Sequence, residues 1–374
     1  MTVARRRLVD EHVTPWYHCI SRAVRRARLC GEDPVSGKDF SHRKTLIEAR
    51  LRELVEIFAV QCAGFALMDN HLHLLLRLDS RAAAAWSAAE VARRWAMLFT
   101  PREVLAPDGS VNAAKLEAWI AARAADPQWI DVHRGRLASL SWFMKCLKEP
   151  IARAANREDN CTGAFWEGRF RSVAVLDVAA LLATAAYIDL NPVAAGIAKT
   201  PEGSRNTTLR ARLDHCKQRG QKVLIKDELS TQSSRPELER DLWLLPIEDR
   251  RERASHAPHG PDNNDASGNN ASETDAVRPG LLEGFTLPCY LRLIDWTSRK
   301  FRTGKARVTA EMASIFERLH FDAEAWYSTM SVLLGAKKLV GNFAGRAEKL
   351  ADLAARAGTH WIKHRGTRRA MLTG

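Results

Sequence analysis

Residues 64–78 read GFALMDNHLHLLLRL, and this stretch decides how the rest of the chain is interpreted. It predicts the turn and second strand of a β-hairpin, with the turn near Asp69–Asn70. Side chains at i and i+2 of a strand emerge on the same face, so His71 and His73 point together and the leucines between them point away. Two neutral imidazoles on a rigid strand suit a divalent transition metal. For this motif alone, a half-buried strand with histidines on its polar face is the more ordinary interpretation.

A second informative stretch lies more than a hundred residues downstream, where residues 183–196 read ATAAYIDLNPVAAG. It predicts a helix that is ended by Pro192 and Gly196. Tyr187 and Asn191 are four residues apart, so both project from one face if the last helical turn reaches Asn191. A phenol nucleophile and an amide ligand would then be neighbours. Taken alone, the two residues are also typical of a core-edge tyrosine and a C-capping asparagine.

The two stretches, together with FWEGRFRS at residues 165–172, resemble the single-tyrosine HUH transposases, specifically the REP-associated tyrosine transposase branch. The resemblance covers roughly residues 14–210. Part of the C-terminal region is more weakly similar to the extension of longer members. Members often carry a basic residue after the YIDLNP motif, where this chain has Ala194. That difference concerns one phosphate contact and leaves the chemistry intact.

The resemblance implies that Tyr187 is the catalytic nucleophile and that His71, His73 and Asn191 hold Mg²⁺ or Mn²⁺. A phenol ionises near pH ~10, so it attacks a phosphodiester at neutral pH only when positive charge favours the phenolate. In the family this attack leaves a 5′-phosphotyrosine and a free 3′-hydroxyl, and the reverse step joins strands. The expected substrate is single-stranded or hairpin DNA with palindromic repeats. The sequence leaves open whether Tyr187 acts in its own chain or across a homodimer.

Composition agrees with an anionic partner. The 374 residues carry a formal net charge of +13 and a pI near 9.7, and 46% of them are hydrophobic, enough for a sizeable core. No apolar run approaches the ~20 residues that span a bilayer, and the seven scattered cysteines form no C-x-x-C pair. We therefore expect a cytoplasmic, nucleoid-associated protein with reduced thiols and no membrane partner.

The order of predicted elements favours an α+β fold with a ferredoxin-like or RRM-like antiparallel sheet and helices on one face. The predicted elements are a strand at 14–21, an amphipathic helix at 38–58 with Leu46, Leu51, Leu54 and Phe58 inward, the hairpin from residue 61, a helix at 136–157, a strand at 164–175 and the Tyr187 helix. This order corresponds to one open sheet whose uncovered face carries the chemistry, with the Tyr187 helix laid across the histidines.

The expected domains follow from shifts in composition. They are a catalytic domain at 1–210 with a helical insertion at about 79–134, a connecting segment at 211–250, a disordered linker at 251–280, and a separate, mainly helical C-terminal extension at 281–374 with a basic tail. The linker contains HGPDNNDASGNNASETD, which has almost nothing to bury. The insertion is alanine-rich and contains three tryptophans, and its sequence indicates no function.

Several cations are candidates for contacts with DNA phosphates. They are Arg22, Arg25 and Arg26 after the first strand, Lys145 and Lys148 on the helix at 136–157, and Arg169 and Arg171, which would share one face of the strand at 164–175. Solvated charged faces are the alternative interpretation of each group. Two other functions compete with a transposase: a domesticated DNA-binding protein of the same fold that does not cleave, and a metal-dependent hydrolase that uses the H-x-H pair.

Overall fold

The structure is a computed structural model, and its described residues cover most of the chain up to residue 220 and parts of the C-terminal region. They are residues 9–24, 27–34, 36–220, 238–239, 241–247, 250–252, 276–278, 280–282, 285–303, 313, 323–335, 343–345 and 347–356. Arg25 and Arg26, most of the predicted linker and the whole basic tail lie outside these ranges.

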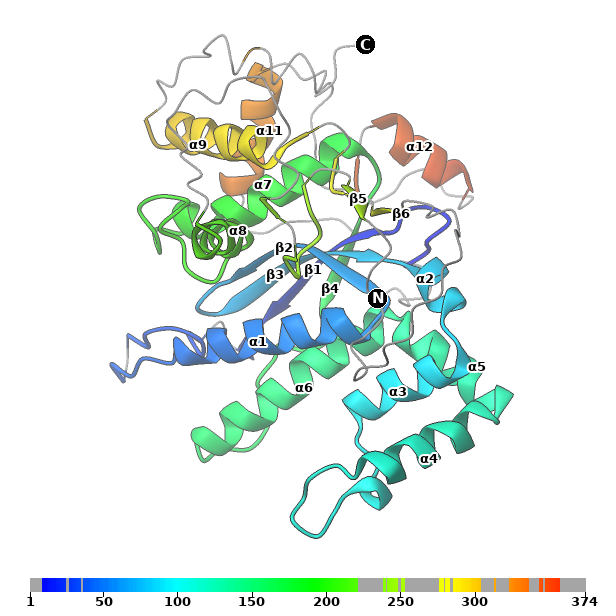
Figure 1. The fold of residues 1–374 in the computed structure, drawn as a ribbon. Helices are drawn as coiled ribbons and strands as arrows, with labels where there is room; N and C mark the ends of the chain where they lie inside the picture. Colours follow the sequence, from blue (N-terminus) through cyan, green and yellow to red (C-terminus); the bar gives the residue numbers. More distant parts are fainter. Residues whose placement is uncertain are drawn as a thin grey trace.

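One sheet of five strands organises the described residues (Figure 1). The strands are β1 (Trp16–Arg22), β2 (Val60–Leu67), β3 (His71–Leu78), β4 (Arg171–Val175) and β7 (Phe343–Ala344). Their order is β2-β3-β1-β4-β7, and the first four pair antiparallel while the short β7 pairs parallel with β4. The predicted α+β class is therefore confirmed, as is the hairpin of β2 and β3 with its turn at residues 68–70.

Helices make up most of the remaining described residues. They are α1 (His42–Ile57), α2 (Ser80–Ala85), α3 (Ala88–Leu98), the 3₁₀ turn η3 (Arg102–Val104), α4 (Ala113–Ala124), α5 (Pro127–Leu137), α6 (Leu140–Glu158), α7 (Val178–Ala194), α8 (Thr208–Gln218), α9 (Leu287–Thr303), α11 (Ala323–Gly335) and α12 (Ala347–Arg356). A further short pair of strands, β5 (Arg250–Glu252) and β6 (Ala276–Arg278), joins the two ends of the predicted linker.

Helices cover both faces of the sheet, so the expectation of helices on one face is wrong. Helices α1 and α6 lie against the face that carries Leu72 and Leu74, and α7 lies across the opposite face against Leu75 and Val173 (Figure 1). Two separate hydrophobic clusters result, one on each face. The face with the histidines is therefore a buried layer beneath α7, not an open surface.

Helix α7 is buried over almost its whole length because it lies between the sheet and the C-terminal helices. Every residue from 179 to 192 is buried. Gly64 of β2 permits the close approach, since a Cβ there would meet Leu75 at 3.3 Å and come within 4 Å of Ile188. An apolar helix of this kind belongs to a protein core. Across the parts of the chain that the structure describes, no helix has the length and apolar character needed to cross a bilayer.

The segment predicted as a helical insertion folds into α2, α3, η3, α4 and α5; α2 lies beside the sheet, and α3, α4 and α5 lie below α2 (Figure 1). Helices α3, α4 and α5 each begin at a residue whose side chain caps the helix N-terminus. Ser87, Asn112 and Asp126 each accept a hydrogen bond from the backbone N–H three residues on, which satisfies an otherwise unpaired donor at each helix start. Ser139 does the same for α6. The predicted helix at 136–157 is therefore two helices, with Arg136 at the end of α5.

Two further expectations differ in detail. The strand predicted at 164–175 begins only at Arg171, because Gly168 has φ +120°, a backbone conformation that ordinary strand residues do not adopt. Arg169 lies before the strand and is exposed, so the predicted shared face of Arg169 and Arg171 is wrong. In α1 the residue that faces inward is Ile47 and not the predicted Leu46, which is 48% exposed.

The C-terminal helices α9 and α11 pack on α7 and belong to the same hydrophobic cluster. Trp326 of α11 and Leu293 of α9 are fully buried in it. The hydroxyl of Tyr290 in α9 donates a hydrogen bond to Asp189 of α7 at 2.6 Å, and both side chains are buried. The described residues of α9 and α11 thus share a hydrophobic core with α7 of the sheet domain.

Candidate metal and nucleophile site

The site begins with the register of the central strands. His73 is opposite Ile20 of β1, and His71 is opposite Arg22. The alternation of β3 sends both imidazoles to the α7 face, where their ring centroids are 4.8 Å apart. His73 is fully buried and His71 is partly exposed at the end of the strand. The predicted convergence of the two imidazoles is therefore present.

Tyr187 of α7 lies next to these histidines. Its ring centroid lies 5.3 Å from that of His73, edge-on at 90°, and 5.9 Å from that of His18. The tyrosine is 7% exposed. The phenol and the H-x-H pair, which are more than a hundred residues apart in the sequence, therefore occupy one small volume between α7 and the sheet.

His18 of β1 is a functional candidate that the sequence analysis missed. It is fully buried, and its Nε2 lies 2.9 Å from Nδ1 of His73 in a hydrogen bond between the two rings. The strand that contains His18 was predicted, but its pairing register with β3 cannot be read from local sequence. The usable signal was the position of His18 between Tyr17 and Cys19, two core residues on the opposite face.

The hydrogen bonds of the two histidines of β3 favour their Nε2 atoms as metal ligands. Asn70 Oδ1 lies 2.6 Å from Nδ1 of His71, which is the arrangement that places the ring proton on Nδ1. For His73, the tautomer in which Nδ1–H donates to His18 places the lone pair on Nε2. Burial and the nearby Arg22 cation lower the pKa of His71 to about 4, so this imidazole is neutral at pH 7.

Asn191 lies one helical turn beyond Tyr187 and is 8% exposed. The helix continues through Pro192 to Ala194 and ends before Gly196, whose φ of +72° reverses the chain. The helical phase that places Tyr187 and Asn191 on one face is therefore present. Asp189, between them in the sequence, accepts hydrogen bonds from the Leu209 N–H and the Tyr290 hydroxyl, which fixes the rotation of α7.

Two of the predicted cations gather at the open end of the site. Arg22 and Arg171 extend from neighbouring strands on the histidine face, and the pKa of Arg171 is lowered by burial and by Arg22. Two guanidinium groups held together in this way favour an anion between them. The cations and His71 form the partly exposed rim of an otherwise buried site.

The other predicted cations lie elsewhere. Lys145 and Lys148 are on α6, on the opposite side of the sheet, and Lys148 donates a hydrogen bond to the Gly168 carbonyl at 2.9 Å. Arg169 lies on the exposed segment before β4. Arg25 and Arg26 lie outside the described residues.

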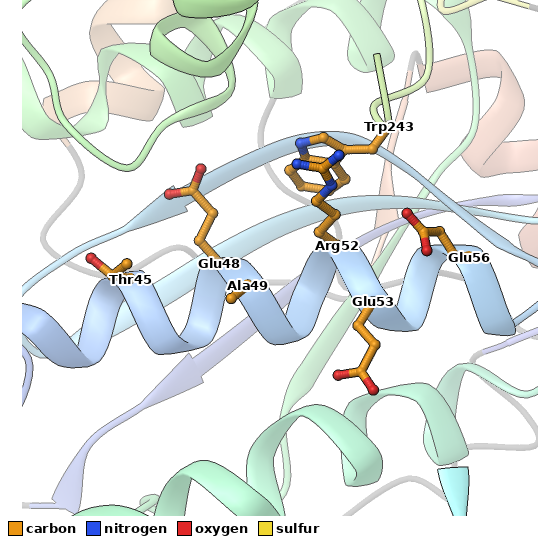
Figure 2. A pocket seen from close by; sticks show the side chains of 7 residues that line it. All are labelled: Thr45, Glu48, Ala49, Arg52, Glu53, Glu56 and Trp243. Atoms are coloured by element: carbon orange, nitrogen blue, oxygen red, sulfur yellow. The ribbon is translucent and has the colours of Figure 1, made fainter. Parts of the chain in front are cut away.

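Two clefts lie near these elements. The larger, about 930 Å³, adjoins the end of α7 at Pro192 and is lined by cations and carboxylates, among them Lys44, Arg205, Arg210 and Asp214. The smaller, about 490 Å³, runs along the outer face of α1 beneath Trp243 and has three glutamates in its lining, Glu48, Glu53 and Glu56 (Figure 2). With Arg52 as its one arginine beside these three glutamates, the lining of the smaller cleft is predominantly acidic.

The predicted donors are the imidazoles of His71 and His73 and the amide of Asn191. Within the described ranges, no three or more His, Cys, Asp and Glu side chains are arranged to hold a metal ion. His18 contacts His73 through the hydrogen bond between the two rings. The candidate site is therefore His71, His73 and Asn191 with Tyr187 beside them.

Comparisons of the chain with protein-family models, with curated proteins and with solved structures find no match. The resemblance to a transposase family therefore depends on the motifs at residues 64–78, 165–172 and 183–196.

Proposed function

We propose that the protein is a metal-dependent tyrosine transposase that cleaves and rejoins single-stranded DNA. The observation that carries the proposal is the position of the Tyr187 ring, 5.3 Å from His73 and on the same helix face as Asn191. A tyrosine that served only to fill the core would have no need of two histidines and an amide beside it. A hydrolase that used the H-x-H pair would not need the tyrosine.

The reaction balances with the groups present. The Tyr187 hydroxyl loses its proton, its oxygen forms a bond to phosphorus, and the bond from phosphorus to the 3′ oxygen breaks. The strand leaves with a 3′-hydroxyl, and the other end stays on Tyr187 as a 5′-phosphotyrosine. Attack by a 3′-hydroxyl reverses these steps and releases the tyrosine, so joining needs no nucleotide cofactor.

The residues present fit a divalent cation. His71 and His73 would bind it through Nε2 and Asn191 through its amide oxygen, which is a donor set that Mg²⁺ and Mn²⁺ accept. A bound ion would supply positive charge for a phosphate oxygen. The protein itself holds the tautomers through Asn70 and His18, and it excludes bulk water by the burial of Tyr187 and His73.

The arrangement of elements also supports the proposal. The strand order β2-β3-β1-β4, with α1 and α6 as crossovers on one face, is the order of a ferredoxin-like sheet. In this arrangement the central strands β3 and β1 carry the histidines. Arg22 and Arg171 stand at the rim, where a phosphodiester would enter.

The test is covalent capture of DNA. A hairpin oligonucleotide with single-stranded flanks, labelled at its 3′ end, is incubated with the full chain and Mn²⁺ or Mg²⁺, and the products are separated under denaturing conditions. We expect a labelled band of protein size from the native chain and none from Tyr187→Phe, because this change removes only the hydroxyl.

The matched control is Tyr327→Phe on α11, a partly buried tyrosine that packs against Lys300 away from the site. It should form the adduct at the native level. Peptide mapping of the adduct should locate the nucleotide on Tyr187. An adduct that persists in Tyr187→Phe, or that maps to another tyrosine, would overturn the assignment.

A further inference from the structure

The helical insertion has a surface of aromatic rings and cations that the proposed site does not use. Trp95, Trp129 and Trp142 come from three different helices, and each is only partly buried. The Trp95 ring centroid lies 5.7 Å from that of Trp142 and 6.5 Å from that of Trp129. Trp119 extends the group, 5.7 Å from Trp129. We call these four tryptophans the tryptophan cluster.

Cations lie against these rings. The guanidinium of Arg136 is 4.7 Å from the Trp142 centroid and 5.5 Å from that of Trp95. The ammonium of Lys145 lies 4.6 Å from the Trp142 centroid. Arg123 contacts the rings of Trp119 and Trp129 at 5.4 and 5.7 Å. Together they place three positive charges on the tryptophan cluster.

Three carboxylates of the insertion contact groups other than these cations. Glu117 pairs with Arg93, Glu90 pairs with Arg94, and Asp126 caps the start of α5. Within the described part of the chain, no ion pair with a carboxylate is formed by Arg123, Arg136 or Lys145. Cations that lie on aromatic rings and lack carboxylate partners keep their charge available for phosphate.

The cluster continues toward the candidate site along α6. Trp142, Lys145 and Lys148 follow one another at three-residue spacing, which brings them along one side of the helix. Lys148 lies 5.5 Å from the Trp166 centroid, and Trp166 bridges to Ala23 at the end of β1, next to Arg22. Rings and cations therefore alternate along α6, on the face of the sheet opposite the histidines, as far as the end of β1 next to Arg22.

We propose that this surface binds a single strand of nucleic acid and leads it from the insertion to the site. Bases stack on indole rings whatever their sequence, and phosphates pair with the cations between the rings. A protein partner would need carboxylates placed to match the three cations. The proposal rests on the proposed function in one respect only: it identifies the bound strand as the DNA strand that Tyr187 would attack.

The probe is an unstructured thymidine oligonucleotide, and binding is followed by quenching of tryptophan fluorescence and by anisotropy. The triple variant Arg123→Gln, Arg136→Gln, Lys145→Gln should weaken binding at least about tenfold and flatten the dependence on salt. The control triple, Arg81→Gln, Arg102→Gln, Lys115→Gln, removes the same charge from exposed positions with no ring beneath them. It should bind within about twofold of the native chain.

A variant that removes one ring without changing the net charge tests stacking separately from electrostatic attraction. Trp142→Leu should weaken binding about 5- to 100-fold, while Trp243→Leu, which alters a tryptophan at the α1 cleft, should not. Equal losses in the two triple variants would reduce the effect to net charge and overturn the proposal. Binding of polyglutamate that competes with the oligonucleotide and is lost in the first triple would also overturn it, in favour of an acidic protein partner.

Adduct formation by the same variants keeps the two proposals distinguishable. If the native chain binds the oligonucleotide through the cluster but never forms an adduct, the transposase proposal fails and the strand-binding surface stands. If the adduct forms on Tyr187 and both triple variants bind equally well, only the surface is wrong. Circular dichroism and thermal melting of each variant show that lost binding does not reflect lost folding.

Discussion

The residues of the candidate site divide into those that simple spacing finds and those that it does not. His71 and His73 follow from two-residue alternation, and Tyr187 and Asn191 follow from four-residue helical spacing. His18 was missed because its contribution depends on the register between β1 and β3, which is set by interactions far apart in the chain. Arg169 was placed wrongly because a positive φ at Gly168 delays the strand. Local periodicity therefore predicts which residues share a face, and long-range pairing decides which faces meet.

A metal-binding measurement tests the histidines separately from the nucleophile. The double variant His71→Ala, His73→Ala should lose Mn²⁺ binding by more than about 100-fold in calorimetric titration, because both imidazole ligands are gone. It should also lose adduct formation. Its salt-dependent DNA binding should largely remain, since phosphate contacts are spread over many cations.

The control for this pair is His12→Ala, His42→Ala, which removes two exposed histidines away from the site. It should bind Mn²⁺ and form the adduct as the native chain does. Full cleavage by the His71 and His73 variant would remove the basis for the metal site.

Among the helices, periodicity located α1 and the Tyr187 helix but placed their boundaries and faces less well. In α1 the buried stripe is Ile47, Leu51 and Leu54, which are spaced four and three residues apart, whereas Leu46 is five residues from Leu51 and falls outside that stripe. The polar side of α1 is also not simply solvated. Asn206, from the segment before α8, donates a hydrogen bond to Glu48 at 2.9 Å.

Glu48 gives α1 a pH dependence that can be measured. Burial raises the pKa of this carboxyl above its usual range, against the lowering effect of the Asn206 hydrogen bond. Because the folded-state pKa is the higher one, its contribution to stability is fully present below the unfolded-state pKa and is lost as pH rises through the folded-state pKa. Urea unfolding at pH 4 and pH 7 should show Glu48→Gln gaining stability relative to the native chain as the pH rises. A difference that is constant, or that shrinks with rising pH, would contradict the raised pKa.

For the chain as a unit, composition predicted the α+β class and the helical nature of the C-terminal region, but not how the parts pack. The histidine face carries polar residues at one end and Leu75, Val173 and Val175 at the other, so its pattern did not show that α7 would cover it. The linker composition says nothing about where the segments on either side of it dock. In the structure, α9 and α11 complete the core over α7.

Limited proteolysis tests this packing. The composition of residues 253–275 still predicts preferential cutting there, because the segment contains no aromatic residue. After cutting, the two fragments should co-elute in size-exclusion chromatography, because α7, α9 and α11 share one core. Fragments that separate without denaturant, or cutting confined to other segments, would contradict this description.

The hydrogen bond from Tyr290 to Asp189 has a consequence for how such a protein can change in evolution. Asp189 lies midway between Tyr187 and Asn191 in the sequence, and its partner Tyr290 lies about a hundred positions later in the chain. Recombination that replaced the C-terminal half with a divergent sequence would leave the buried Asp189 carboxylate facing a mismatched surface, beside Tyr187 and Asn191. The two halves should therefore be inherited together, and natural chimaeras should preserve this pair of residues across the junction.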